Sequence, residues 1–171
     1  MWPRVCLATA RLTLTAWVGA AVLFVVIGVQ TATSKDDNLN KSKVKDSLVL
    51  VRFPTYYAFG FTLVTISGIA LLAGRNRLGL CGRRFRIAIL LLAAGLAVMA
   101  ADYIWIYSPL EKMITPPGST RPARFVALHN ASMYINATHI GLFLLAAIVI
   151  CWPRSDMNIP KAHAAGNATR D

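Results

Sequence analysis

Four long stretches that carry almost no formal charge constrain this chain more than any other feature of its sequence. They lie between Arg11 and Lys35, Arg52 and Arg75, Arg86 and Glu111, and Arg124 and Arg154, and only Asp102 interrupts them. Each exceeds the roughly 20 apolar residues that cross a hydrocarbon core as an α-helix, and none shows the period-two alternation of a membrane β-strand. We therefore predict an all-α integral membrane protein with spans at about 12–33, 53–74, 87–107 and 125–152.

Composition agrees with a membrane location and indicates the kind of partner. Of the 171 residues, 56% are hydrophobic, the mean hydropathy is +0.54, and the formal net charge is +11. In a soluble protein such a charge would suggest nucleic acid, but here the basic residues flank apolar runs and form no basic face with interleaved aromatic residues. The expected partner is therefore the lipid bilayer, and nucleic acid is not expected.

The connections predict the topology. The segment RNRLGLCGRRFR after the second stretch holds five arginines and no acidic residue, and short loops of this kind face the cytoplasm. The first stretch is long for a signal peptide and lacks a clear cleavage site, so we expect it to be retained. An up-down four-helix bundle with both termini in the cytoplasm follows, in a bacterial inner (plasma) membrane, with residues 153–171 as a polar, disordered tail.

Small and aromatic residues suggest how the helices pack. Ala93, Ala97 and Ala101 repeat every four residues, and Gly28 with Ala32 and Gly60 with Gly68 offer further places for close approach. Aromatic residues near the predicted boundaries are expected to be interfacial anchors; they are Trp17, Trp105, Tyr107 and Trp152.

Polar residues in the predicted spans gather toward one end of the bundle. His129, Ser132, Asn136 and His139 follow one another at spacings of three and four, which places them on one side of a helix. Asp102 is the only carboxylate inside a span, and ionisable residues there are functional candidates. The candidate cluster, which would bind or pass a small polar solute, ion or proton, comprises Arg52, Tyr56, Asp102, His129, Ser132 and Asn136. We expect Asp102 and His129 to be its titratable pair.

Other interpretations of the same residues stay open. The polar stripe can act only as packing between helices, in a scaffold that binds lipid or a protein partner. A haem- or metal-handling redox protein is the further alternative, although His129 and His139 lie about 15 Å apart on one helix and cannot bind one ion together. No nucleophile with a neighbouring base, phosphate-binding glycine loop or carboxylate pair is present, so we expect neither an enzyme nor a cofactor.

Four short motifs follow one another along the chain: W-x-G at Trp17, R-x-x-x-Y-Y at Arg52, S-P at Ser108, and R-F-x-x-L-H-x-x-S-x-x-x-N from Arg124 to Asn136. Their order resembles that of a four-helix membrane family catalogued as domain of unknown function 4149, which includes transmembrane protein 205-like proteins. The resemblance implies a four-helix membrane protein with His129, Ser132 and Asn136 as marked positions, and it implies no activity. The chain departs from the family at Gln30, where we expect proline, and in its charged first loop.

Overall fold

A computed structural model describes residues 2–75 and 82–152, and this part of the chain contains helices and no strands. The long helices are α1 (Trp2–Thr33), α3 (Ser42–Gly74), α4 (Gly82–Asp102) and α6 (Arg124–Cys151), with a short α2 (Asp37–Asn40) between the first two. A π-helical turn, η1 (Tyr103–Tyr107), and α5 (Ser108–Met113) continue α4 without a break. Four helices are long and apolar enough to cross a membrane, which confirms that part of the prediction. The predicted disordered tail lies outside the described residues.

The helices extend beyond the apolar stretches from which their spans were predicted. The first loop shows the difference best, because most of its charged sequence is helical: α2 begins at Asp37 and α3 begins at Ser42, well before the expected boundary at 53. The side chain of Asp36 accepts a hydrogen bond from the backbone N–H of Asn38 and so caps α2. The charged residues therefore predicted where the apolar surface of each helix ends, but the helices themselves continue beyond them.

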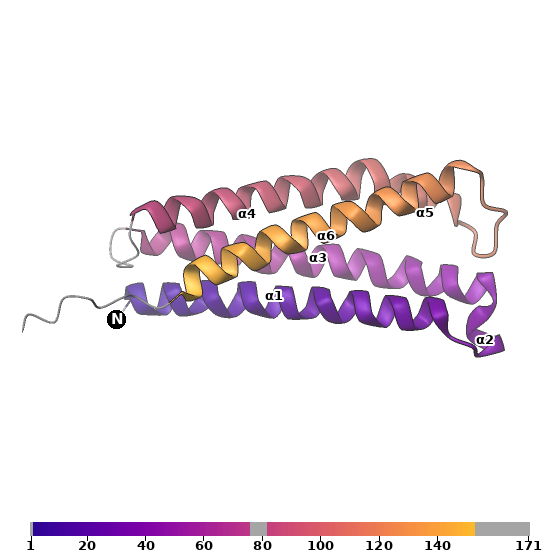
Figure 1. Cartoon of the computed structure of the whole chain (residues 1–171), viewed down its shortest axis with the longest axis horizontal. Coiled ribbons are helices and arrows are strands. Elements are labelled where there is room, and N and C mark those ends of the chain that lie inside the picture. Colours follow the sequence, from indigo (N-terminus) through magenta and orange to yellow (C-terminus); the bar gives the residue numbers. More distant parts are fainter. Residues whose placement is uncertain (1, 76–81, 153–171) are drawn as a thin grey trace, which may run out of the picture.

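Pairs of contacting residues show how α1 lies along α3. Ser67 donates to the carbonyl oxygen of Ala10, the rings of Trp17 and Tyr56 lie 4.9 Å apart, and those of Phe24 and Phe53 lie 5.0 Å apart. Residue numbers rise along α1 as they fall along α3, so the two helices run in opposite directions (Figure 1).

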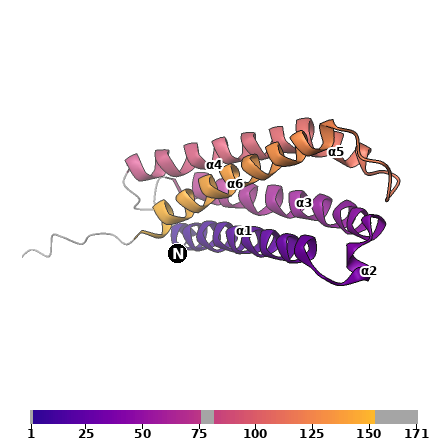
Figure 2. The same ribbon diagram turned by 45° about the vertical axis from the view of Figure 1, so that its right-hand side comes forward.

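The other half of the molecule pairs α4 with α6 in the same manner. Gly95 faces Phe143, and Asp102 accepts a hydrogen bond from Asn136 farther along. Arg11 Nε of α1 also donates to the carbonyl oxygen of Ile150 in α6, at 2.8 Å. The short α2 and residues 114–123 share one end of the molecule, which we call the α2 end, and the N-terminus of α1 lies at the other end (Figures 1 and 2).

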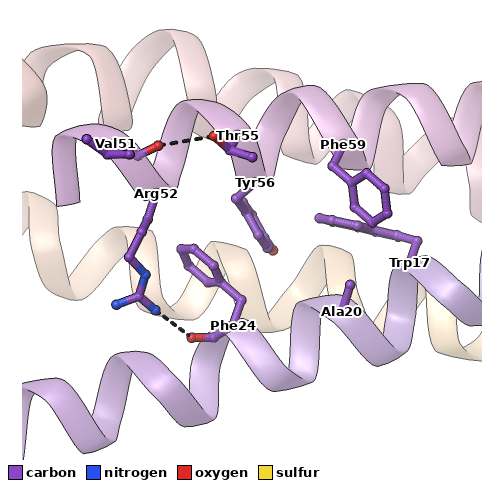
Figure 3. A pocket seen from close by; sticks show the side chains of 8 residues that line it. All are labelled: Trp17, Ala20, Phe24, Val51, Arg52, Thr55, Tyr56 and Phe59. Carbon is purple, nitrogen blue, oxygen red and sulfur yellow. Dashed lines mark hydrogen bonds between the residues drawn. The ribbon is translucent and has the colours of Figure 1, made fainter. Parts of the chain in front are cut away.

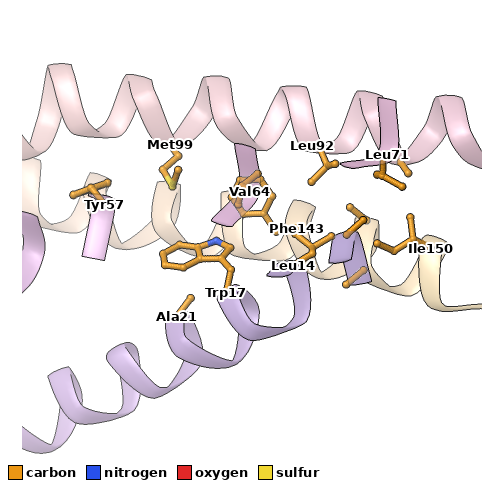
Figure 4. Packing of buried hydrophobic residues seen from close by; sticks show 14 of the residues in the cluster. Leu14, Trp17, Ala21, Tyr57, Val64, Leu71, Leu92, Met99, Phe143 and Ile150 are labelled. Carbon is orange, nitrogen blue, oxygen red and sulfur yellow. The ribbon is translucent and has the colours of Figure 1, made fainter. Parts of the chain in front are cut away.

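Two glycines form notches that receive the rings of Trp17 and Phe143. Figure 4 shows both rings among the buried residues of the core. A Cβ atom built on Gly60 would lie 2.7 Å from the Trp17 ring, and one on Gly95 would lie 2.5 Å from the Phe143 ring. Trp17 is 1% exposed, so the prediction that it is an interfacial anchor is wrong. Tyr107 is buried as well, whereas Trp105 and Trp152 are exposed as anchors would be.

The expected alanine ridge in α4 does not face a neighbour. Ala93 and Ala97 are exposed, while the buried positions of this helix are Ala88, Leu92, Gly95, Met99 and Asp102. The side of α4 that turns inward is the one that buries the Asp102 carboxyl group and offers Gly95 to Phe143. Burial of a polar group and fit to a large ring therefore decide the face, and small size alone does not.

An ion pair between a buried aspartate and an exposed arginine fastens the α2 end. Asp46 of α3 lies 2.7 Å from the guanidinium of Arg121 and accepts a second hydrogen bond from the backbone N–H of Gly118. The guanidinium of Arg121 also lies over the ring of Phe125, 4.6 Å from its centroid. These contacts hold the segment before α6 against the start of α3.

Alanine at either notch should destabilise the protein. Gly95→Ala and Gly60→Ala push a methyl group into a buried ring and should lower the free energy of unfolding by about 1–3 kcal/mol. Gly19→Ala is the matched control, because a Cβ atom there meets nothing within 4 Å and alanine favours the helix. Thermal unfolding of the full-length protein in detergent measures the difference. Equal melting temperatures for the Gly19 and Gly95 variants would contradict the notch packing.

Candidate functional site

The helical turn after Asp102 decides which side chains reach the bundle interior. In η1 the backbone N–H of Ser108 donates to the carbonyl oxygen of Tyr103, five residues earlier. Residues five apart lie about 140° apart around an α-helix, whereas this wider turn brings Asp102 and Tyr107 to the same buried side. Pro109 gives a physical reason, because it lacks an N–H and its ring clashes with the carbonyl group four residues earlier.

Asp102 is the centre of the candidate site. It is 0% exposed, and its Oδ2 atom accepts hydrogen bonds from Tyr57 Oη at 2.6 Å and from Asn136 Nδ2 at 2.8 Å. The donors belong to α3 and α6, so the carboxyl group joins three helices. Its other oxygen, Oδ1, is buried and has no hydrogen-bond partner among the described residues.

The hydrogen bonds of Asn136 fix the direction of the network. Asn136 Nδ2 lies 3.0 Å from the carbonyl oxygen of Ser132 and 3.1 Å from the Ser132 hydroxyl oxygen. A carbonyl oxygen can only accept, so the amide nitrogen must face it and Asn136 Oδ1 must face His139 Nε2, 3.1 Å away. The ring nitrogen of His139 therefore donates. The network runs from His139 through Asn136 to Asp102, and its donors point toward the carboxyl group.

Several polar atoms in the same interior retain unused hydrogen-bonding capacity. In a neutral His139 whose proton is on Nε2, Nδ1 is an acceptor, and it is buried without a partner among the described residues. The ring of Tyr56 lies 6.4 Å from that of His139, and Trp17 packs against Tyr56. Within the described chain, buried donor groups are also unpaired at Trp17 Nε1, Tyr56 Oη and Tyr107 Oη. Such groups are rare in protein interiors, so their presence here calls for a physical explanation.

Three of the six candidate residues occupy the predicted cluster. Asp102, Ser132 and Asn136 are in direct or consecutive contact. Tyr56 is buried one layer away, beside Trp17 and His139, and makes no direct hydrogen bond to Asp102.

Arg52 and His129 do not join this cluster, which corrects their expected roles. Arg52 lies on the seam between α1 and α3, where it donates to the carbonyl oxygen of Phe24 at 3.5 Å. His129 is exposed on α6 and stacks on Phe125, with ring centroids 5.8 Å apart. The expected titratable pair of Asp102 and His129 is therefore wrong, because His129 lies near the start of α6, beyond the buried part of its polar stripe.

The interior partners that replace them are Tyr57 and His139. Tyr57 begins a buried series at spacings of three and four residues, which continues with Gly60, Val64, Ser67, Leu71 and Gly74. His139 lies in the corresponding series of α6, between Ser132 and Phe143. This heptad pattern was readable in the sequence and would have selected Tyr57 over Arg52.

Neither a metal cluster nor a known relative adds to this description. In residues 2–75 and 82–152, no group of three or more His, Cys, Asp or Glu side chains is placed to hold a metal ion. Comparisons with protein-family models, with curated proteins and with solved structures found no match to the chain. The chemistry of the candidate site must therefore be argued from its own residues.

The contact between Tyr57 and Asp102 can be tested by a double-mutant cycle. Tyr57→Phe removes a donor from a buried carboxyl group and should lower the free energy of unfolding by about 1–3 kcal/mol. In an Asp102→Leu background, which has no acceptor, the same change should cost far less. Thermal unfolding of the four proteins in detergent gives the coupling energy. A coupling energy near zero would show that the hydroxyl group does not bind Asp102.

Proposed function

We propose that this protein is a multi-pass protein of a bacterial plasma membrane in which Asp102 reversibly binds a proton or a small monovalent cation. In this proposal the helices form an up-down bundle with both termini in the cytoplasm, so the α2 end faces outward. The arginine-rich connection between α3 and α4 supports that orientation. No catalytic step is proposed.

The charge balance around Asp102 carries the proposal. A buried carboxylate is costly unless it is neutralised or paired, and the donors to Asp102 are the neutral Tyr57 and Asn136. Among the described residues the one ion pair is that of Asp46 with Arg121, at the α2 end. Within residues 2–75 and 82–152, no cationic side chain pairs with Asp102, and a bound proton or small cation would balance its charge. The unpaired Oδ1 atom offers a place for either.

The distribution of polar residues along the bundle favours binding over passage. From Asp102 the hydrogen bonds reach His139, near the middle of α6. Beyond His139 the buried residues are mainly apolar, and they include Leu14, Leu71, Leu92, Phe143 and Ile150. Of the residues that the structure describes, Ser67 has the one buried hydroxyl in that region, and it is already bonded to the carbonyl oxygen of Ala10. A site that is loaded from the α2 end fits this arrangement better than a complete pathway.

Membership of the domain of unknown function 4149 family stays part of the proposal. Ser132 and Asn136 belong to the longest motif of the resemblance, and both lie at the Asp102 site. His129, the third marked position of that motif, lies on the surface of α6. The resemblance therefore supports the Asp102 site at two positions out of three.

A non-catalytic scaffold is the second candidate function, and one observation favours it. The same hydrogen bonds that surround Asp102 also join α3, α4 and α6, as expected of polar contacts that hold membrane helices together. In that case Asp102 would contribute to stability and would bind no ligand.

Infrared difference spectroscopy on the full-length protein in lipid nanodiscs separates these candidates. If Asp102 exchanges a proton, lowering the pH should produce a protonated-carboxyl band that is absent in Asp102→Asn. A small cation that competes for the site should shift the pH at which the band appears. Asp46→Asn is the matched control, since it removes the other carboxyl group that is buried among the described residues and should leave the band in place.

The opposite result is equally specific. If Asp102→Asn lowers the melting temperature but changes no pH- or cation-dependent signal, then the carboxyl group only holds helices together. The scaffold interpretation would then replace the proposed binding site.

A further inference from the structure

We propose that the groove between α1 and α3 binds an anionic phospholipid, with the phosphate at Arg52 and an acyl chain directed toward Trp17. This site shares the buried Trp17 and Tyr56 with the interior around His139 but includes none of the hydrogen bonds to Asp102. It rests on the proposed function only in its placement of the helices across a membrane. Figure 3 shows the groove, with Arg52 and Phe24 at one end and Trp17 and Phe59 at the other.

The shape and lining of the groove suit an acyl chain. It has a volume of about 290 Å³, and most of its lining is apolar or aromatic. Tyr56 and Trp17 are buried at its base, while Val51 and Phe59 at its edges are 71% and 46% exposed. The groove therefore opens sideways on the bundle, toward the position of lipid tails in a membrane.

The level of Arg52 matches that of a phospholipid headgroup. Charge alone predicts that the second span begins at about residue 53, so Arg52 lies at the expected boundary between headgroups and hydrocarbon. The groove continues from there to Phe59, seven residues or about 10 Å farther along α3 toward the membrane interior. A phosphate at Arg52 would thus place the first part of its acyl chain along the aromatic lining.

The electrostatics of the seam select a negative headgroup. The guanidinium of Arg52 has one hydrogen bond to the described chain, a 3.5 Å contact with the carbonyl oxygen of Phe24, and it lies over the Phe24 ring at 5.1 Å. Its other N–H groups are available for a phosphate, to which arginine binds well. Lys45, two helical turns nearer the α2 end, donates to the carbonyl oxygen of Ala32 and adds positive charge on the same seam.

Native mass spectrometry of the full-length protein in detergent tests this site. The probes are phosphatidylglycerol and phosphatidylcholine with identical acyl chains, because they differ in net headgroup charge and not in their tails. We expect phosphatidylglycerol to bind about five- to tenfold more tightly, as one additional charge-assisted contact would produce. Arg52→Gln should remove most of this preference while leaving phosphatidylcholine binding almost unchanged.

Two matched controls make the result specific. Arg86→Gln removes an exposed arginine of α4 that also bonds to a backbone carbonyl, so it reports general attraction to anionic lipid. Ala20→Phe fills the groove and should weaken the binding of both lipids, whereas Val22→Phe places a ring on the far, exposed side of α1 and should not. Melting temperatures confirm that each variant is folded.

Several outcomes would overturn the lipid site. The unaltered protein could bind the two lipids equally well. Arg52→Gln and Arg86→Gln could reduce the preference for phosphatidylglycerol by the same amount. A folded Ala20→Phe variant could bind both lipids as well as the unaltered protein does. The infrared band of Asp102 in Arg52→Gln distinguishes the two proposals. Suppose that this band titrates normally and that the unaltered protein shows no preference for phosphatidylglycerol. The proposal of a lipid site is then wrong, and the proposal of a binding site at Asp102 stands.

Discussion

A carboxyl group inside an apolar bundle must be surrounded by hydrogen-bond donors, and much of this structure depends on how Asp102 meets that requirement. Tyr57 and Asn136 reach it from two different helices. Their side chains can do so only if α3, α4 and α6 keep one particular rotation about their axes. The same rotation turns Gly95 toward Phe143 and leaves Ala93 and Ala97 outside. The hydrogen bonds to Asp102 thus determine which apolar side chains of these helices contact one another.

The cost of this arrangement is that not every polar atom is satisfied. Donors converge on one oxygen of Asp102 while the other stays unpaired, and His139 uses one of its two ring nitrogens. In a protein selected only for stability, apolar residues of similar volume would be expected to serve as well at these positions. This retained hydrogen-bonding capacity is the observation on which the proposed ligand site rests.

The sequence predicted the four apolar helices well, because length and the absence of charge are sufficient for that conclusion. It also identified Asp102, Ser132 and Asn136, since few polar residues interrupt the spans. The roles of Arg52 and His129 could not be predicted in the same way. Residues at the same height along the bundle can point in different directions. Which side of a helix turns inward depends on contacts with residues far away in the sequence. His139 was already placed on the polar side of its helix by its spacing, whereas Tyr57 would have required following the heptad pattern through apolar and polar positions alike.

The π-helical turn at Tyr103–Tyr107 divides the third long helix into two parts with different phases. Before it, buried positions follow one heptad pattern that ends on Asp102; after it, Tyr107, Leu110 and Ile114 begin another that is displaced by one residue. An unbroken α-helix would carry the first pattern on to Ile106 and turn Tyr107 away from the core. Asp102 is consequently the last buried position of the first heptad pattern, and the second pattern begins only at Tyr107. A discontinuity of this kind lets one continuous helix present a buried carboxyl group and, five residues later, a buried tyrosine to the same interior.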